Sequence, residues 1–333
     1  VLKIAITVAI IVLAILPFST LTSDEIVSEL DPQEIVFKSS KLHLKSNATR
    51  SRAALCAIAL DEEPYLQEWV DYHIGLGFDL VYVFDNSESH DLKQWKNEQP
   101  EYVKVTHLPG ISMQTEAYRQ CAKSLLEAGK HHWAAFFDVD EFLVLRQHDT
   151  VSSFLNKYLV AGALGINWIY MGTSNRSIYE PMPVAYRFNL RVSNTTNMHI
   201  KTIAVLKDIN MNGKFHCHFL PLKPGLRTVD TNGRRIKGPF NRRGPESIAA
   251  LYHFFSKSSK EFVMKRIRGR ADTVKYDTSY YETLNESMHG WMSGDREDNS
   301  VWLTLKKNVP KYSVYETIHD SDKVAQMFTN HKC

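Results

Sequence analysis

The chain has 333 residues, 44% of them hydrophobic, so it is long enough to bury a substantial core. Its formal net charge is only +3, whereas nucleic-acid binding usually requires a concentrated basic face, so we expect no nucleic-acid partner. These properties predict one large domain with additions, and the charge selects no partner.

An apolar run occupies residues 4–18, and polar, acidic sequence follows it. This pattern is typical of an export signal or a membrane anchor, although the run is shorter than the ~18 to 20 residues that span a bilayer. A signal-anchor, a cleaved signal and a buried core helix are all open, and we expect the anchor at residues 1–18. Residues 19–50 lack a sustained hydrophobic period, which predicts a stem between a membrane and a domain at 51–333.

Sequons and cysteines agree with export. Four Asn-x-Ser/Thr sequons begin at Asn47, Asn175, Asn194 and Asn285. The four cysteines are Cys56, Cys121, Cys217 and Cys333, which could form two disulfides in an oxidising lumen. Cys56 and Cys121 equally suit buried free thiols, because each stands among apolar residues. The sequence therefore leaves the disulfide pairing open.

Strand and helix patterns alternate from residue 53 to residue 139. An unbroken apolar run predicts a buried strand at 53–60, and further strands are expected at 80–84, 103–108 and 132–139. Leu66, Trp69, Val70 and His73 recur at helical spacing, and a second helix is expected at about 113–128. This order predicts right-handed parallel crossovers in an open α/β sheet. In such sheets ligands bind beyond the carboxyl ends of the strands.

The second half is less regular. Apolar segments predict strands at 164–171, 202–206, 216–220 and 251–255. Ser258 and Glu261 have the spacing of a capping box, which predicts the start of a helix. We therefore expect an α/β fold with a mixed central sheet and flanking helices.

Acidic residues directly follow the strand expected at 132–139. In an extended backbone, residues two apart share a face, so Asp138 and Asp140 would point together while Val139 points away. Two carboxylates on one side suit a hard divalent ion such as Mn²⁺ or Mg²⁺, which could bridge a diphosphate. A short D-x-D motif is weak alone, but its position at a strand end predicts a metal site.

The chain contains several motifs whose residues and order along the sequence resemble those of glycosyltransferase family 92 (DUF23) and related family-2-like glycosyltransferases. They are Asp61-Glu62-x-x-Tyr65-Leu66-x-Glu68-Trp69, Tyr72-His73-x-x-Leu76-Gly77, Val83-Phe84-Asp85-Asn86-Ser87, Trp133-x-x-Phe136-x-Asp138-Val139-Asp140-Glu141-Phe142 and Tyr252-His253-Phe254-x-x-Lys257-Ser258-x-x-Glu261-Phe262. Together they cover roughly residues 53 to 270. A set of motifs in the same order is far more specific for a family than any single motif.

The resemblance implies a GT-A fold, a UDP-linked nucleotide-sugar donor, and Mn²⁺ dependence. UDP-galactose becomes the first donor to test. Carried over by position, the residues that would bind the nucleotide sugar are Glu62, Asp85, Asp138 and Lys257. Those that would bind the metal are Asp138, Asp140 and His253.

Several of the candidate site residues also have an alternative, structural role. Asp85 could instead cap a turn, because Asp-Asn-Ser is ordinary turn chemistry, and His253 could be a satisfied core residue. Inverting transfer needs a carboxylate base, and the candidates are Glu180, which could also be a surface acid, and Glu141, which could instead orient its neighbours.

Two further clusters need an interpretation. His216 and His218 flank Cys217, but no second pair has zinc-finger spacing, so we expect one of the histidines near the donor rather than zinc. The basic segment 234–243 could be solvated, could clamp a diphosphate, or could bind an anionic polysaccharide acceptor.

We expect a single-pass type II Golgi membrane protein whose lumenal domain transfers a hexose to a glycan hydroxyl with inversion. Its partners would be the nucleotide-sugar donor, a glycan or glycoconjugate acceptor, and the membrane through the N-terminal segment. The alternatives are a catalytically inert glycan-binding relative and a metal-dependent hydrolase or nucleotidyltransferase. Gly-rich phosphate loops, Gly-x-Ser-x-Gly elbows and His-Glu-x-x-His helices are absent from the sequence, so their chemistries have no support.

Overall fold

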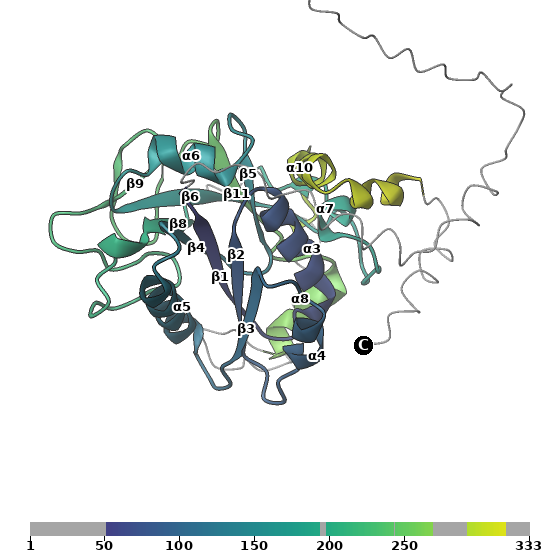
Figure 1. Cartoon of the computed structure of the whole chain (residues 1–333). Helices are drawn as coiled ribbons and strands as arrows, with labels where there is room; N and C mark the ends of the chain where they lie inside the picture. Colours follow the sequence, from purple (N-terminus) through teal and green to yellow (C-terminus); the bar gives the residue numbers. More distant parts are fainter. Residues whose placement is uncertain (1–50, 194–197, 243, 269–291, 318–333) are drawn as a thin grey trace, which may run out of the picture. The chain divides into compact units, whose positions relative to one another are not determined.

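A computed structural model describes residues 51–193, 198–242, 244–268 and 292–317 of the chain (Figure 1). The expected anchor and stem lie outside these residues, as do Cys333 and the sequons at Asn47, Asn194 and Asn285. Within the described ranges, no helix combines the length and the apolarity that crossing a membrane requires.

The first half alternates strands and helices, and the hydrophobic pattern predicts most of them but not the helices at 92–97 and 151–158 or the strand at 141–145. Its elements are β1 (Ala53–Ala59), α3 (Glu63–Gly75), β2 (Leu80–Asp85), α4 (Leu92–Asn97), β3 (Val103–His107), α5 (Gln114–Ala128), β4 (Trp133–Phe136), β5 (Glu141–Leu145) and α6 (Val151–Tyr158). Helix α5 ends at Gly129, whose φ of 61° lies in the left-handed region that glycine adopts readily. Helix α6 begins at Thr150, whose hydroxyl accepts a hydrogen bond from the Ser153 backbone N–H.

The second half contributes antiparallel and short elements. They are β6 (Ala163–Tyr170), α7 (Val184–Arg187), β7 (Leu190–Arg191), β8 (Ile200–Val205), η2 (Leu206–Asp208), β9 (Thr228–Val229), β10 (Arg235–Ile236), β11 (Ala249–His253), α8 (Ser259–Arg268), β12 (Arg296–Glu297), α10 (Ser300–Asn308) and η3 (Pro310–Glu316). The capping box is confirmed at the start of α8. The Ser258 N–H donates to Glu261 Oε2 (3.1 Å), and the Glu261 N–H donates to Ser258 Oγ (3.3 Å).

The main sheet has ten strands and is mixed, as expected. Its principal order is β10-β9-β6-β8-β4-β1-β2-β3, and β11 joins β5 to β6. Strand β1 is parallel to β2 and β4, and β2 is parallel to β3, so the carboxyl ends of these four strands meet at one edge. Strand β8 runs antiparallel to β4 and brings its first residues, from Ile200 onward, to the same edge. This edge therefore collects side chains from both halves of the chain.

Alternation along β1 divides the core into two layers. Leu55 and Ala57 pack in the layer that includes α3, whereas Cys56 and Ile58 pack in the layer that includes α5. Figure 1 shows α3 and α5 on opposite faces of the sheet. Cys56 forms a disulfide with Cys121 of α5, so of the two states left open for these cysteines the disulfide is present.

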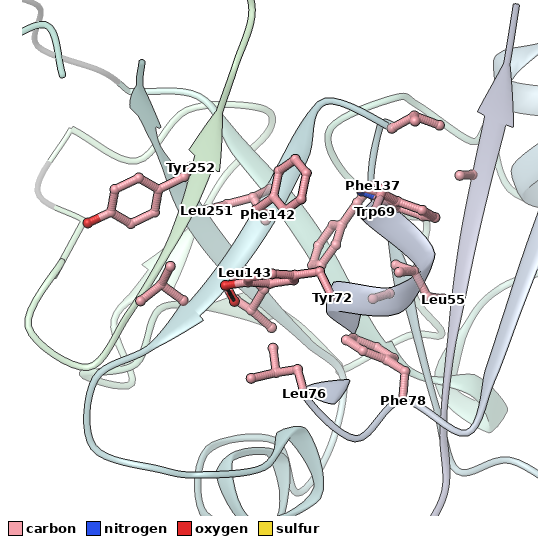
Figure 2. Close-up of a cluster of buried hydrophobic side chains, with 14 of the residues drawn as sticks. Leu55, Trp69, Tyr72, Leu76, Phe78, Phe137, Phe142, Leu143, Leu251 and Tyr252 are labelled. Carbon is pink, nitrogen blue, oxygen red and sulfur yellow. Dashed lines mark hydrogen bonds between the residues drawn. The ribbon is translucent and has the colours of Figure 1, made fainter. Parts of the chain in front are cut away.

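Aromatic side chains fill the layer between α3 and strand β5 (Figure 2). The ring of Tyr72 meets that of Phe142 edge to face, with 5.1 Å between centroids. The Trp69 indole N–H donates to the Glu141 carbonyl (2.8 Å), and the Tyr72 hydroxyl donates to the Leu143 carbonyl (2.8 Å). These bonds anchor the strand that follows the acidic residues to helix α3.

Two predicted strands are wrong in extent or type. The strand expected at 132–139 ends at Phe136, and residues 137–140 form a turn that reverses the chain into β5. The segment 216–220 is irregular rather than a strand. Apolar composition alone predicted both strands, and it does not distinguish a buried turn from a buried strand.

Candidate functional site

Asp138 lies just beyond the carboxyl end of β4 and binds one lysine. Its Oδ1 accepts hydrogen bonds from Gln114 Nε2 (2.7 Å), Tyr118 Oη (3.1 Å) and Lys201 Nζ (2.7 Å). Its Oδ2 has no partner among the described residues, and the side chain is 32% exposed. Burial opposes ionisation, but Lys201 lowers the pKa of Asp138, so this carboxylate is ionised and keeps one oxygen available.

Asp140 is more deeply buried and binds a different lysine. Its Oδ2 contacts Lys265 Nζ of α8 and lies 3.4 Å from His253 Nε2 at the end of β11. Burial raises the pKa of Asp140, yet Lys265 and His253 together hold it well below its usual range. The expectation that Asp138 and Asp140 share a face rested on an extended backbone. The turn at 137–140 replaces that backbone, and each carboxylate pairs with its own lysine.

Glu141 is fully buried beside the two aspartates. Its Oε2 accepts the Asp138 backbone N–H (2.8 Å) and lies 3.8 Å from Lys201 Nζ. Burial raises the pKa of Glu141 well above its usual range, because the opposing attraction of Lys201 is smaller. The Glu141 side chain is 0% exposed, so it is enclosed away from a bound acceptor hydroxyl. The geometry therefore suits the orienting role better than the role of catalytic base.

Glu62 follows β1 and joins the same cluster through Lys257, which precedes α8, and through Arg268 at the end of α8. Lys257 Nζ lies 3.3 Å from its Oε2, and Arg268 binds its Oε1. Burial raises the pKa of Glu62, but Lys257 and Arg268 lower it further than burial raises it. Glu62 is thus an ionised carboxylate whose cationic partners come from about 200 residues further along the chain.

Lys257 is held in an unusual conformation. Its φ is +52°, in the left-handed region that non-glycine residues rarely adopt, and the side chain is 4% exposed. Its Nζ lies 4.0 Å from the ring centroid of Tyr65, and burial lowers its pKa. Asp61, next to Glu62, also has a positive φ of 50°. Backbone strain of this kind concentrates at functional sites, where the surrounding packing maintains it.

The cluster as a whole has more cations than anions. Its ionised carboxylates are Glu62, Asp138 and Asp140, and its cations are Lys201, Lys257, Lys265 and Arg268. Buried charges are costly unless a counter-charge or solvent compensates for them, and the side chains of Asp138, Lys265 and Arg268 remain 32%, 24% and 18% exposed. The cluster therefore has the electrostatics of an anion site that contains carboxylates able to hold a cation.

Two other predicted site residues, Asp85 and Glu180, contact groups outside this cluster. Asp85 accepts from the backbone and hydroxyl of Ser87 through Oδ1 (3.0 and 2.7 Å) and from the Leu92 N–H through Oδ2 (3.0 Å), so it caps the loop after β2. Glu180 pairs with Arg176 through both carboxylate oxygens (2.7 and 2.5 Å). Their predicted roles, as nucleotide-binding residue and catalytic base, stay predictions.

Aromatic rings continue from His253 away from the acids. The His253 ring centroid is 4.3 Å from that of Trp168, and Trp168 is 5.0 Å from both His199 and His218. Burial lowers the pKa of His218 to about 3, so it is neutral. Trp168 Nε1 and His253 Nδ1 are buried and have no hydrogen-bond partner in the part of the chain that the structure describes.

Lys257 was predicted to bind the nucleotide sugar, but Lys201 and Lys265 of the cluster received no role from the sequence. Lys201 stands in the apolar run Ile200–Val205, and a charged residue inside a buried strand is a signal that could have revealed it. Lys265 had no such signal, because a basic residue near the end of a helix is ordinary.

A model of glycosyltransferase family 92 matches residues 53–224, which is more than half of the chain. The chain belongs to glycosyltransferase family 92. The match includes Glu62, Asp138, Asp140 and Glu141 and ends before the C-terminal motif. The structure joins that motif to the family region, since Lys257 lies 3.3 Å from Glu62 and His253 lies 3.4 Å from Asp140.

Individual relatives agree with the family. A family 92 protein of Ricinus communis is 28% identical over 116 residues, or 34% of this chain and 20% of its own length. A family 92 protein of Arabidopsis thaliana is 27% identical over 107 residues, or 31% of this chain and 18% of its own length. The aligned part thus spans about a fifth of these relatives. The crystal structure of S. aureus TarS 1–349 aligns with a TM-score of 0.33 and 9% identity, over 84% of this chain and 78% of that one.

Proposed function

We propose that this family 92 protein has a GT-A fold and transfers a hexose from a UDP-linked donor to a glycan hydroxyl with Mn²⁺ or Mg²⁺, with inversion. UDP-galactose is the first donor to test. The observation that carries the proposal is the cluster at the carboxyl ends of β1 and β4, where cations outnumber ionised carboxylates. That charge balance suits a diphosphate together with a divalent ion.

The residues present would fit a divalent ion after two side chains move. Asp140 Oδ2 and His253 Nε2 lie 3.4 Å apart, close to the spacing of about 3 Å between neighbouring ligands on an ion with bonds of about 2.1 Å. Asp138 Oδ2 has no partner among the described residues. No three His, Cys, Asp or Glu side chains of the described ranges already form a metal-binding group, so Asp138 would have to turn and Lys265 withdraw. When bound, the ion would neutralise charge on the departing nucleoside diphosphate.

The chain's own residues would perform the other steps. Lys257 and Arg268 would release the carboxylate of Glu62 and bind phosphate oxygens of the donor instead. Glu141 would hold the Asp138 backbone in place through its hydrogen bond to the Asp138 N–H. Glu180 remains the proposed base, and it would have to leave Arg176 to accept the acceptor's proton.

A lumenal Golgi location is part of the proposal. The Cys56–Cys121 disulfide supports an oxidising compartment. Asn175 of the second sequon lies exposed in a turn, where a glycan could be attached. Membrane attachment through residues 1–18 rests on the sequence pattern alone.

Donor hydrolysis tests the function. The protein should release sugar slowly from one nucleotide sugar, only with Mn²⁺ or Mg²⁺, and faster in transfer to an acceptor. Asp138→Asn should lower both rates at least about 100-fold, whereas Asp149→Asn, at a position whose side chain is 84% exposed, should not.

Three results would contradict the proposal. Equal rates in the two variants would exclude a role for Asp138. Full-speed release of sugar or pyrophosphate without an acceptor would indicate a hydrolase or nucleotidyltransferase. Glycan binding without any donor turnover would indicate an inert relative.

A further inference from the structure

A surface cavity of about 320 Å³ lies beside strands β9 and β10. Leu226 and Ile236 contribute apolar lining, and the charged residues of the lining are Arg227, Arg235 and Lys237. No acidic residue lines it. The cavity therefore combines a concave shape with charge of a single sign, and such a surface concentrates anions.

The three cations lack acidic partners. None of them forms an ion pair with another described residue, in contrast to the lysines of the acidic cluster. The nearest acid in the sequence, Asp230, is 2% exposed, and its Oδ1 accepts the backbone N–H groups of Asn232 and Arg234. The charge of the cavity is thus available to an external anion.

A series of aromatic rings connects the edge of the cavity with the acidic cluster. Phe240 stands two residues after Gly238 of the cavity lining and is 47% exposed. Its ring centroid is 4.7 Å from His199, which is 5.0 Å from Trp168, which in turn is 4.3 Å from His253. His253 contacts Asp140. An occupant of the cavity can therefore extend over Phe240 and His199, which lead toward the more deeply buried Trp168 and His253 at the proposed transfer site.

The rings suit sugar units. The C–H faces of a sugar are apolar and pack on aromatic surface, and hydroxyl groups can both donate and accept hydrogen bonds. At the inner end of the series, Trp168 Nε1 and His253 Nδ1 are buried without partners among the described residues. Hydroxyl groups of a bound sugar would supply those partners if the rings moved to admit them.

We propose that this cavity binds an acidic group, a carboxylate or a sulfate, of the acceptor glycan, whose sugar units lie along Phe240 and His199 toward Trp168. The inference rests on the proposed function, because it identifies the occupant as the acceptor. It assigns the basic segment to acceptor binding rather than to the donor diphosphate.

Binding of defined oligosaccharides to the full chain tests this. Calorimetry in the absence of nucleotide sugar measures the affinity of the protein for oligosaccharides that carry a carboxylate or a sulfate. Each acidic oligosaccharide is compared with a neutral counterpart. At least one acidic member should bind about tenfold tighter than its counterpart. The double variant Arg235→Gln, Lys237→Gln should lose that preference, and Arg234→Gln, Arg242→Gln, with the same charge change outside the cavity lining, should keep it.

Several outcomes would overturn the inference. They are equal binding of acidic and neutral members, equal losses in the two double variants, and binding to anionic vesicles that depends on Arg235 and Lys237 while no oligosaccharide binds. Thermal unfolding of each variant shows whether it is folded. The Asp138→Asn protein should retain the acidic preference, so loss of donor turnover with intact glycan binding would refute the proposed function alone.

Discussion

Replacement of Lys265 by Met should destabilise the protein and enlarge its response to Mn²⁺. Lys265 contacts Asp140, which is 3% exposed, and no other lysine or arginine pairs with that carboxylate among the described residues. Lys265→Met would leave a buried carboxylate with only His253 beside it. A divalent ion could then replace the lost positive charge without first displacing an ammonium group.

The magnitude follows from burial. Removing one partner of a buried ion pair costs about 3–5 kcal/mol, and the 24% exposure of Lys265 reduces this to about 2 kcal/mol through solvent screening. For a domain of this size that corresponds to a fall of about 4–8 °C in Tm. Saturating Mn²⁺, at about 100 times its Kd, should restore about 2.7 kcal/mol in the variant and less in the native protein.

Differential scanning calorimetry with and without Mn²⁺ measures both effects. Lys307→Met is the matched control, because Lys307 pairs with Asp149 at 2.6 Å while both side chains are more than 60% exposed. This control should unfold like the native protein and show the native response to Mn²⁺.

The reasoning would be refuted if Mn²⁺ raised the Tm of all three proteins equally. It would also be refuted if Lys265→Met were as stable as Lys307→Met. The first result would place the metal away from Asp140, and the second would mean that solvent alone compensates for this carboxylate.

Three further predictions concern stability. Replacing Cys56 and Cys121 by Ser should lower the free energy of unfolding in urea by about 4 kcal/mol, since the disulfide joins residues 65 apart; an unchanged midpoint would contradict it. Burial raises the pKa of Glu68 from 4.5 to about 7, so the folded protein holds a proton that the unfolded chain releases. Stability should therefore fall by up to about 3 kcal/mol as the pH rises from 4.5 to 7, and Glu68→Gln should abolish that slope. Arg187→Met should cost about 3–5 kcal/mol in thermal unfolding, because the buried guanidinium makes two 3.0 Å bonds to Glu261. Adding Glu261→Gln should recover most of that loss, and no recovery would show that Arg187 acts through packing.

Local pattern was sufficient for strands β1 to β3 and for helices α3 and α5 of the first half. The strand Ala53–Ala59 and the helix Gln114–Ala128 follow from an unbroken apolar run and from helical spacing. The capping box at Ser258 was equally readable, because its two hydrogen bonds lie within four residues. Where the chain turned inside an apolar segment, as it does after Phe136, the pattern failed.

The sequence by itself determined that Asp138 and Asp140 follow a buried strand and that the chain belongs to family 92. Only the tertiary structure decided which cations accompany them, because Lys201 and Lys265 are 63 and 125 residues away from their partners. An ion pair forms when the fold brings two charges within a few ångströms, and no local periodicity encodes that approach. The orientation of the two carboxylates depends in the same way on the turn that separates them from β4 and on the helix packed against them.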